Sequence, residues 1–454
     1  MRLGDAAGGA SDLVARANVS GQTSVILIDP ATGETLDQFS PMTALPPASV
    51  AKTATALYAL ETLGRDFVFD TTLIATGPVS EGTLSGDLIL AGSGDPTMDT
   101  DDLLDLSRQL AATGIRRITG RFLIWDGALP YAAEIEPGQM DHLGYNPSVS
   151  GLNLNYNRVF FEWAKQGSGF TVRMDARSEK VSPAVSVARM QVVDRDAPVY
   201  TYAENGDFDD WTVSKAALND NGGYWLPVRH PGLYCGDVLR TLAAADGVTL
   251  PVAERMSAPA SGQVIATVRS APLIDIAKDC LKYSTNLVAE SIGLKATAVR
   301  SSTPRSIAES AGDLNDWVLA RTGSAITLHD HCGLSGASRC SSASLAQMLA
   351  APNVSDLLEP ILKTIPLTDD KGNRITGPTE VKAKTGTLNF ASTLAGYIHC
   401  QSGRTLAFAI MSADLDKRQS AIDSNAEIPA GARSWAGRAR RLQQGLLQHW
   451  GAVY

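Results

Sequence analysis

The sequence contains few cysteines, and their spacing excludes the small folds that depend on them. No two of the five form a Cys-x-x-Cys pair, so neither a disulfide scaffold nor a structural zinc site is expected. Cys332 and Cys340 bracket a short turn and could pair in an oxidising compartment, which would still leave at least one cysteine unpaired. The five are Cys235, Cys280, Cys332, Cys340 and Cys400.

Long apolar runs and an excess of positive charge are also missing. No run reaches the roughly 18 apolar residues of a membrane span, and residues 1–9 lack the apolar stretch of a signal peptide. We therefore expect a cytosolic protein or one whose signal sequence has been removed. Lys and Arg number 39 against 48 Asp and Glu, so the net charge is −9 and a nucleic-acid partner is not expected.

The remaining composition is that of a folded protein with several domains. The chain has 454 residues, of which 44% are hydrophobic and 19% are charged. At about 100 to 200 residues per domain, this length predicts two to four domains, each able to bury its own core.

The N-terminal part predicts a β-hairpin followed by a helix. Residues 24–29 form a β-branched run, the turn-forming residues 30–33 follow, and a second strand is expected through 36–39. After Pro46-Pro47, the stretch from 49 to 60 is rich in Ala, Thr and Leu, which predicts a buried helix that begins at or beside Ser49.

The C-terminal part predicts three strands and a long helix. The strands are expected over 381–387, 393–400 and 405–411. Apolar residues then recur at helical spacing from Trp435 to Trp450, with arginines off the apolar stripe. These arginines indicate a solvated helix face, or at most a weak peripheral attachment to a membrane.

The middle of the chain predicts a strand, a helix and a strand, and then a mostly β region. Residues 84–96, 101–112 and 118–125 give the first three elements. Nucleotide binding is not expected there, because Gly92-x-Gly94 lacks a third glycine and the following Asp-Pro interrupts the helix start. Residues 167–224 show short alternating strands.

Ser49-Val50-Ala51-Lys52 places a hydroxyl and an amine three residues apart, and hence on one face of the expected helix. Ser49 lies at the helix end, where unpaired N–H groups and the helix dipole favour developing negative charge. This is the geometry that a serine nucleophile and its base need. Ser-x-x-Lys alone is a weak pattern, since a helix cap followed by a surface lysine produces it as well.

Two further motifs follow Ser-x-x-Lys along the chain, and the order of the three makes a catalytic role for the first more specific. Ser284-Thr285-Asn286 precedes an apolar helix, and Lys384-Thr385-Gly386-Thr387 lies on an expected strand, where the glycine would let a ligand approach the backbone. Ser-x-x-Lys, Ser-x-Asn and Lys-Thr-Gly in this order resemble the signature of penicillin-binding proteins and serine β-lactamases.

The spacing of the motifs indicates which class of these proteins the chain resembles. The stretch between Lys52 and Ser284 is far longer than a connection within one catalytic core needs, so we expect domains to be inserted there. Such an insertion resembles class C low-molecular-mass penicillin-binding proteins, the D-alanyl-D-alanine carboxypeptidase/endopeptidase family, peptidase family S13. Further similarity lies in residues 86–96, 270–273 and 330–335, although His331-Cys332 replaces the family's usual Gly-Ser.

The resemblance implies an α/β (α+β) penicillin-binding protein or β-lactamase-like fold. An antiparallel five-stranded sheet flanked by helices would carry two nested inserted domains. Residues 1–66 and 269–454 would form the discontinuous catalytic domain, and residues 67–92 and 160–268 an inserted, mostly β domain. Residues 93–159 would form an inner α/β domain.

The resemblance also implies a role for each motif residue. Ser49 would form an acyl-enzyme with the penultimate D-alanine, with Lys52 as the base, and Ser284 would relay a proton to the leaving D-alanine. A lysine base requires that its ammonium form be disfavoured, and burial and a second cation would both act in that direction. Asn286 would hold Lys52 and the substrate amide. Lys384, Thr385, Gly386 and Thr387 would bind the substrate carboxylate.

Two other functions and a metal site compete with this interpretation. A β-lactamase would need to deacylate rapidly, and the sequence has no Glu-x-x-Leu-Asn stretch to position the water. A non-catalytic cell-wall binding protein would have broken motifs, whereas all three are intact. His329-Asp330-His331-Cys332 could suggest metal ligation, but ligands so close in sequence rarely converge on one ion, so we expect no metal and no cofactor.

The resemblance finally implies the partners and the compartment. Peptidoglycan stem peptides would be the substrates, β-lactam antibiotics would be covalent inhibitors, and the protein would be periplasmic after removal of its signal peptide. Arg339 and Asp141 match family positions that would recognise the carboxylate and the amine at the end of meso-diaminopimelate. The alternative is that both are unrelated surface charges.

Overall fold

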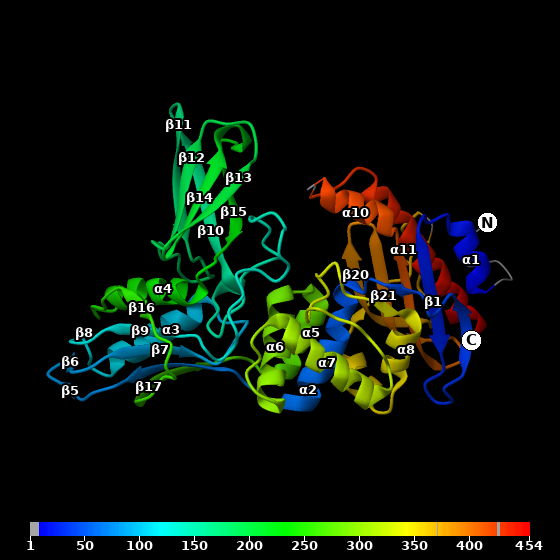
Figure 1. Ribbon diagram of the computed structural model, residues 1–454, viewed down its shortest axis with the longest axis horizontal. Helices are drawn as coiled ribbons and strands as arrows, with labels where there is room; N and C mark the ends of the chain where they lie inside the picture. The colour runs from blue at the N-terminus through cyan, green and yellow to red at the C-terminus, as the bar shows by residue number, and fades with distance from the viewer. Residues whose placement is uncertain (1–8, 370, 425–426) are drawn as a thin grey trace. The chain divides into compact units, whose positions relative to one another are not determined.

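The first long strand of the chain pairs with strands from its other end. In the computed structural model, which describes residues 9–369, 371–424 and 427–454, the chain divides into two compact units. The first unit comprises Met1–Arg65, Ile274–Ala289 and Ile307–Tyr454. The second comprises Asp66–Leu273 and Glu290–Ser306. Figure 1 shows the blue strand β1 in the same unit as the orange C-terminal strands.

The sheet of the first unit is antiparallel throughout, in the order β19-β20-β21-β22-β1-β2. The predicted N-terminal hairpin and the three predicted C-terminal strands are confirmed. The sheet has six strands rather than the expected five, because a two-residue strand, too short to show an alternating pattern, adds to one edge. The strands are β1 (Gln22–Ile28), β2 (Thr35–Phe39), β19 (Lys363–Thr364), β20 (Glu380–Leu388), β21 (Ala391–His399) and β22 (Thr405–Ala413).

Helices cover both faces of this sheet, because its central strands are apolar on both sides. On one face, α1 (Ala10–Ala17) and α11 (Ala432–Val453) enclose a core that includes Leu27, Phe408 and Trp450. On the other face, α8 (Ser342–Ala350) packs on β1 and β22, where the Ser24 hydroxyl donates to Ser342 Oγ at 2.7 Å. Successive side chains of β1 point to opposite faces of the sheet, so odd-numbered residues pack against α1 and α11 and even-numbered residues against α8.

Further helical elements lie along the chain, and most of α6 belongs to the second unit. A 3₁₀ turn, η2, precedes α2, as expected for a helix that begins beside Ser49. Short strands β3 (Ala44–Leu45) and β18 (Cys340–Ser341) pair with each other. The helical elements are η2 (Ala48–Val50), α2 (Ala51–Leu63), α5 (Leu273–Tyr283), α6 (Asn286–Arg300), α7 (Ile307–Thr322), α9 (Val354–Leu358), η5 (Glu359–Ile361) and α10 (Leu415–Asp423).

The second unit contains a mixed five-stranded sheet in the order β16-β9-β7-β4-β17. Its strands are β4 (Asp70–Ala75), β7 (Leu88–Gly92), β9 (Phe122–Trp125), β16 (Ala253–Arg255) and β17 (Gln263–Arg269). Helices α3 (Thr100–Ala112) and α4 (Pro231–Ala245) pack together and share a core with this sheet. A small sheet joins β5 (Val79–Ser80), β6 (Thr83–Leu84) and β8 (Arg117–Ile118).

Two three-stranded sheets form the mostly β region that the sequence predicts. Their orders are β11-β10-β15 and β12-β14-β13. The 3₁₀ turn η3 (Asn155–Asn157) precedes β10, and the 3₁₀ turn η4 (Lys215–Ala217) precedes β15. The strands are β10 (Arg158–Gln166), β11 (Gly169–Asp175), β12 (Ala188–Val193), β13 (Tyr200–Asn205), β14 (Phe208–Ser214) and β15 (Asn221–Pro227).

One strand of the inner domain expected at 93–159 pairs with strands outside that range. Strand β9 pairs in parallel with β7 on one side and β16 on the other. The strands of residues 158–227 pair with one another in two separate sheets. Pairing between strands so distant in sequence leaves no local pattern from which it could be predicted.

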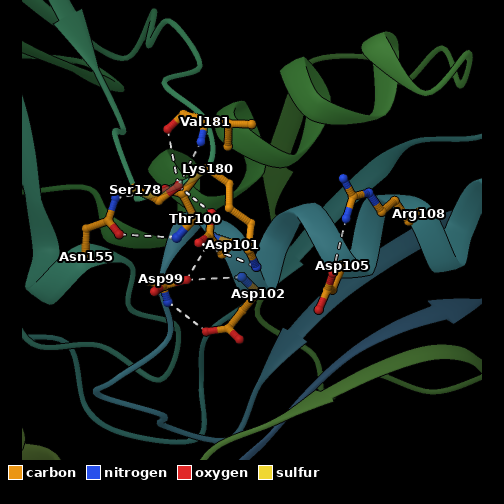
Figure 2. A network of polar contacts seen from close by, with 10 residues as sticks. All are labelled: Asp99, Thr100, Asp101, Asp102, Asp105, Arg108, Asn155, Ser178, Lys180 and Val181. Carbon is orange, nitrogen blue, oxygen red and sulfur yellow. Dashed lines mark hydrogen bonds and ion pairs between the residues drawn. The ribbon is translucent and has the colours of Figure 1, made fainter.

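The N-terminus of α3 is capped by its own carboxylates, as Figure 2 shows. Asp99 accepts hydrogen bonds from the backbone N–H groups of Asp101 at 2.8 Å and Asp102 at 3.1 Å, and Asp102 accepts one from Asp99 N at 2.9 Å. Asn155 accepts from Thr100 N at 3.2 Å. The N–H groups that a nucleotide phosphate would need are therefore occupied by protein groups.

Two expectations about covalent and membrane attachment can be compared with the structure. No disulfide is formed among the described residues: Cys332 and Cys340 are both buried but do not pair with each other. Within the same residues, no helix combines the length and the apolar content needed to cross a bilayer.

Candidate active site

Ser49 lies in a tight turn that other elements hold in place. The preceding residue, Ala48, has a left-handed backbone with φ +48°, an uncommon conformation for a residue with a side chain. Thr393 Oγ1 on β21 donates to the Pro47 carbonyl at 2.7 Å. A Cβ on Gly386 would lie 2.1 Å from Thr393 Oγ1, so the glycine of the Lys-Thr-Gly motif lets β20 and β21 close on this turn.

Lys52 reaches Ser49 from the first turn of α2. Its side chain is only 1% exposed, and its Nζ donates to Ser49 Oγ at 2.9 Å, to Asn286 Oδ1 at 2.7 Å and to the Cys332 carbonyl at 2.8 Å. The predicted contacts of Lys52 with Ser49 and with Asn286 are thus present. An ammonium group has three N–H donors, and each has an acceptor here.

Ser284 and Asn286 lie at the junction between α5 and α6. Ser284 has φ +64°, and its N–H donates to the Cys280 carbonyl at 2.8 Å, which ends α5. Asn286 is the first residue of α6. The sharp junction thus brings both side chains of the Ser-x-Asn motif into contact with lysines, Asn286 with Lys52 and Ser284 with Lys384.

Lys384 is a buried cation on β20. It is 1% exposed, and its Nζ donates to Ser284 Oγ at 3.0 Å and to the Thr385 carbonyl at 2.7 Å. Burial, followed by the nearby positive charge of Lys52, lowers the pKa of Lys384 to about 7. The sequence predicts only that Lys384 binds the substrate carboxylate, so its lowered pKa is a new finding.

The other motif residues on β20 alternate as a strand requires. Thr385 and Thr387 are exposed, whereas Lys384 and Gly386 are buried. The edge strand β19 pairs with Lys382 and Ala383, and its pairing ends there. The edge of β20 beyond that point is where an extended peptide could align.

The loop at 330–335 contributes a contact that the sequence did not reveal. The Asp330 carboxylate, 1% exposed, accepts the backbone N–H groups of Gly333 and Ser335, each at 2.6 Å. His331 Nε2 lies 2.8 Å from Ser310 Oγ. These hydrogen bonds stabilise the loop. The loop contacts Lys52 through the main-chain carbonyl of Cys332. Every residue type has such a carbonyl, so the sequence could not predict this contact.

Arg339 and Asp141, the residues predicted to select the stem peptide, belong to different units. Arg339 Nη1 donates to the carbonyls of Gly336 at 2.7 Å and Ser338 at 2.8 Å. Asp141 is exposed, and its main-chain carbonyl accepts a bond from the buried Arg229 at 2.9 Å. Their joint role stays a prediction.

Comparisons with known proteins agree with the motifs. The model of the D-Ala-D-Ala carboxypeptidase 3 (S13) family matches residues 10–430, and the chain therefore belongs to this family. The D-alanyl-D-alanine carboxypeptidase of Actinomadura sp. (strain R39) is 26% identical over 426 residues, which cover 86% of this chain and 77% of that protein. The D-alanyl-D-alanine carboxypeptidase DacB of Haemophilus influenzae is 24% identical over 394 residues, which cover 80% of this chain and 79% of DacB.

Solved structures show the same fold. Penicillin-binding protein 4 from Haemophilus influenzae superposes with a TM-score of 0.78 at 22% identity, covering 96% of this chain and 99% of that one. A second structure of that protein, in complex with a β-lactam, gives a TM-score of 0.73 at 21% identity and covers 94% and 97% of the two chains. The expected penicillin-binding protein fold of mixed α and β structure is confirmed.

Proposed function

We propose that the protein is a serine D-alanyl-D-alanine carboxypeptidase and endopeptidase that acts on the stem peptides and cross-links of peptidoglycan. The observation that carries this proposal is the 2.9 Å contact between Lys52 Nζ and Ser49 Oγ, made beside the Lys384–Ser284 pair. A hydroxyl within hydrogen-bond reach of a buried amine is the arrangement that serine acylation needs. Family membership and the names of the relatives support the same activity.

In the acylation step, Lys52 in its neutral form takes the hydroxyl proton of Ser49 while Ser49 Oγ attacks the carbonyl of the penultimate D-alanine. The backbone N–H groups of Ser49 and Thr387 stabilise the oxyanion. The C–N bond then breaks, and the proton reaches the leaving nitrogen through Ser284. Ser284 Oγ accepts a bond from Lys384, so its own hydroxyl hydrogen can point toward that nitrogen.

The substrate is held by its terminal carboxylate and its amide. Lys384 supplies the charge, and the exposed hydroxyls of Thr385 and Thr387 supply further donors along the β20 edge. Asn286, whose Oδ1 accepts from Lys52, also holds the substrate amide. Water then hydrolyses the ester, which frees Ser49.

A β-lactam should acylate Ser49 in the same way and remain bound as a stable acyl-enzyme. Ring opening acylates Ser49, but the leaving group stays tethered to the adduct, which slows its hydrolysis. Peptidoglycan stem peptides are therefore the proposed partners and β-lactams the covalent inhibitors. The proposed compartment is the periplasm, where such substrates lie.

Mass spectrometry after incubation with penicillin tests this proposal. We expect one covalent adduct, located by peptide mapping within residues 49–52, and release of D-alanine from a D-alanyl-D-alanine peptide. Ser49→Ala should abolish both, whereas Ser20→Ala, a serine outside the candidate site, should change neither. An adduct on another peptide, or one retained in Ser49→Ala, would refute the assignment, and an adduct hydrolysed within seconds would indicate a β-lactamase.

A further inference from the structure

The loop at 330–335 contacts two parts of the candidate site at once. The Cys332 carbonyl accepts a hydrogen bond from Lys52 Nζ at 2.8 Å. The next residue, Gly333, has φ +78°, and a Cβ built on it would lie 1.9 Å from the Ala48 carbonyl oxygen. One short loop therefore sets the position of the base and lies against the turn that carries the nucleophile.

A buried carboxylate holds this loop by its backbone. Both oxygens of Asp330 accept a backbone N–H from the loop, one from Gly333 and one from Ser335, at 2.6 Å each. Bonds to a charged acceptor are shorter and stronger than neutral ones, and two of them define the direction of the loop. Thr55 on α2 adds a third restraint by donating to the His331 carbonyl at 2.7 Å.

The partners of Lys52 determine where its lone pair points. A neutral amine keeps two N–H groups and one lone pair. The Cys332 carbonyl and the Asn286 amide oxygen can only accept hydrogen bonds, so together they engage both N–H groups. The lone pair is then left facing Ser49 Oγ, the one partner of the three that can donate a proton.

We propose that Asp330 is a positioning residue for acylation. It holds the Cys332 carbonyl on Lys52 and Gly333 against the Ala48 turn, so that the lone pair of Lys52 is directed at the Ser49 hydroxyl before substrate arrives. The inference rests on the proposed function, in which Ser49 is acylated with Lys52 as the base. The thiol of Cys332 has no part in it, because the contact is made by the main chain.

The test separates the limiting rate of acylation by a labelled penicillin from the concentration that gives half of that rate. Asp330→Asn replaces one acceptor oxygen by an NH₂ group facing a backbone N–H, so the loop must shift. The limiting rate should fall by about tenfold to a hundredfold, as expected for a small misplacement of a reacting group. The half-saturating concentration should stay within about twofold, because the β20 edge is unchanged.

Thr55→Val provides a milder second variant. It removes the hydrogen bond to the His331 carbonyl with little change in shape, and it should lower the limiting rate in the same way but less. If Asp330→Asn does not fold, this variant decides the question. Rates are expressed per site titrated by saturating label, so that misfolded protein does not contribute.

A control in the other unit isolates the proposed mechanism. Asp237→Asn removes a similar buried acceptor there, where Asp237 accepts from Ser186 N at 2.6 Å, and should keep the limiting rate.

Full limiting rates in both Asp330→Asn and Thr55→Val would overturn the inference, as would a change confined to the half-saturating concentration. Failure of the wild-type protein to be acylated at Ser49 would instead refute the proposed function.

Discussion

Lys384 is a cation that the fold has buried almost completely, and its chemistry follows from that burial. Two neutral oxygens, Ser284 Oγ and the Thr385 carbonyl, accept its hydrogen bonds, and Lys52 lies near enough to destabilise its charge. A substrate carboxylate would supply the missing negative charge. The binding energy of the carboxylate is therefore largest for the protonated form, which dominates below a pKa of about 7.

This pKa predicts the pH dependence of the reaction. As the pH rises through about 7, Lys384 loses its proton, and kcat/KM for a D-alanyl-D-alanine peptide should fall, by up to about tenfold per pH unit. Lys384→Arg keeps its charge at all these pH values, so this alkaline fall should disappear even if the overall rate is lower.

The matched control is Lys382→Arg, two residues earlier on β20, where the lysine pairs with Glu380 at 2.9 Å. It should keep the alkaline fall. The measurement is kcat/KM from pH 6 to pH 9 for the three proteins. The shapes of the three pH profiles are compared, not their absolute values. A profile that is flat for the wild type, or that falls equally in Lys384→Arg, would contradict the assignment of this titration to Lys384.

At the scale of elements, the site depends on close approaches of backbone that only glycine permits. Gly386 on β20 and Gly333 in the 330–335 loop both face the turn at Pro47 and Ala48, from different segments of the chain. Ala48 itself has a positive φ, a conformation that costs about 1 kcal/mol or more without such support. The turn that precedes Ser49 is thus held by packing rather than by its own backbone preference.

Gly333→Ala should therefore be strongly disruptive. Its Cβ would meet the Ala48 carbonyl oxygen at 1.9 Å, and φ at this position is +78°. We expect a loss of about 2 kcal/mol or more in stability, seen as a lower thermal unfolding midpoint, together with slower acylation.

Gly312→Ala is the control for this change. Gly312 lies within α7, and a Cβ there would meet no heavy atom within 4 Å, so alanine should stabilise the helix by up to about 1 kcal/mol. Equal unfolding midpoints for the two variants would show that the close contact at Gly333 is not structurally important.

The sequence could predict features with a local pattern, but not contacts between residues that are distant along the chain. The Ser49–Lys52 pair was predictable, because three residues along a helix is a local spacing that fixes which side chains meet. Hairpins and amphipathic helices have equally local patterns. The two-residue β19 has none, and neither does the contact of Thr393 with Pro47, which joins residues distant in sequence. The Cys332 carbonyl contact is independent of residue type altogether.

On the scale of the whole molecule, one catalytic unit is assembled from both ends of the chain. Ser49 and Lys52 come from the first segment of the first unit, Ser284 and Asn286 from the second, and Lys384 from the third. Residues 66–273, which lie between Lys52 and Ser284, form the second unit together with residues 290–306. We propose that residues 66–273 are an insertion that comprises one α/β body with residues 158–227 nested inside it, as the strand pairing suggests.

The last prediction concerns Arg339, a residue of the first unit. Meso-diaminopimelate carries a free carboxylate at its end, and an arginine can bind a carboxylate through paired hydrogen bonds. A simple D-alanyl-D-alanine peptide lacks this carboxylate, so the loss of Arg339 should affect only the longer peptide.

Arg339→Ala should lower kcat/KM about tenfold or more for a peptide with a free diaminopimelate terminus, and should spare a simple D-alanyl-D-alanine peptide. Arg321→Ala, which removes an arginine that pairs with Glu61 at 2.9 Å, serves as the control and should affect neither substrate. Equal losses on both peptides in Arg339→Ala would show that Arg339 does not bind the side chain of the stem peptide.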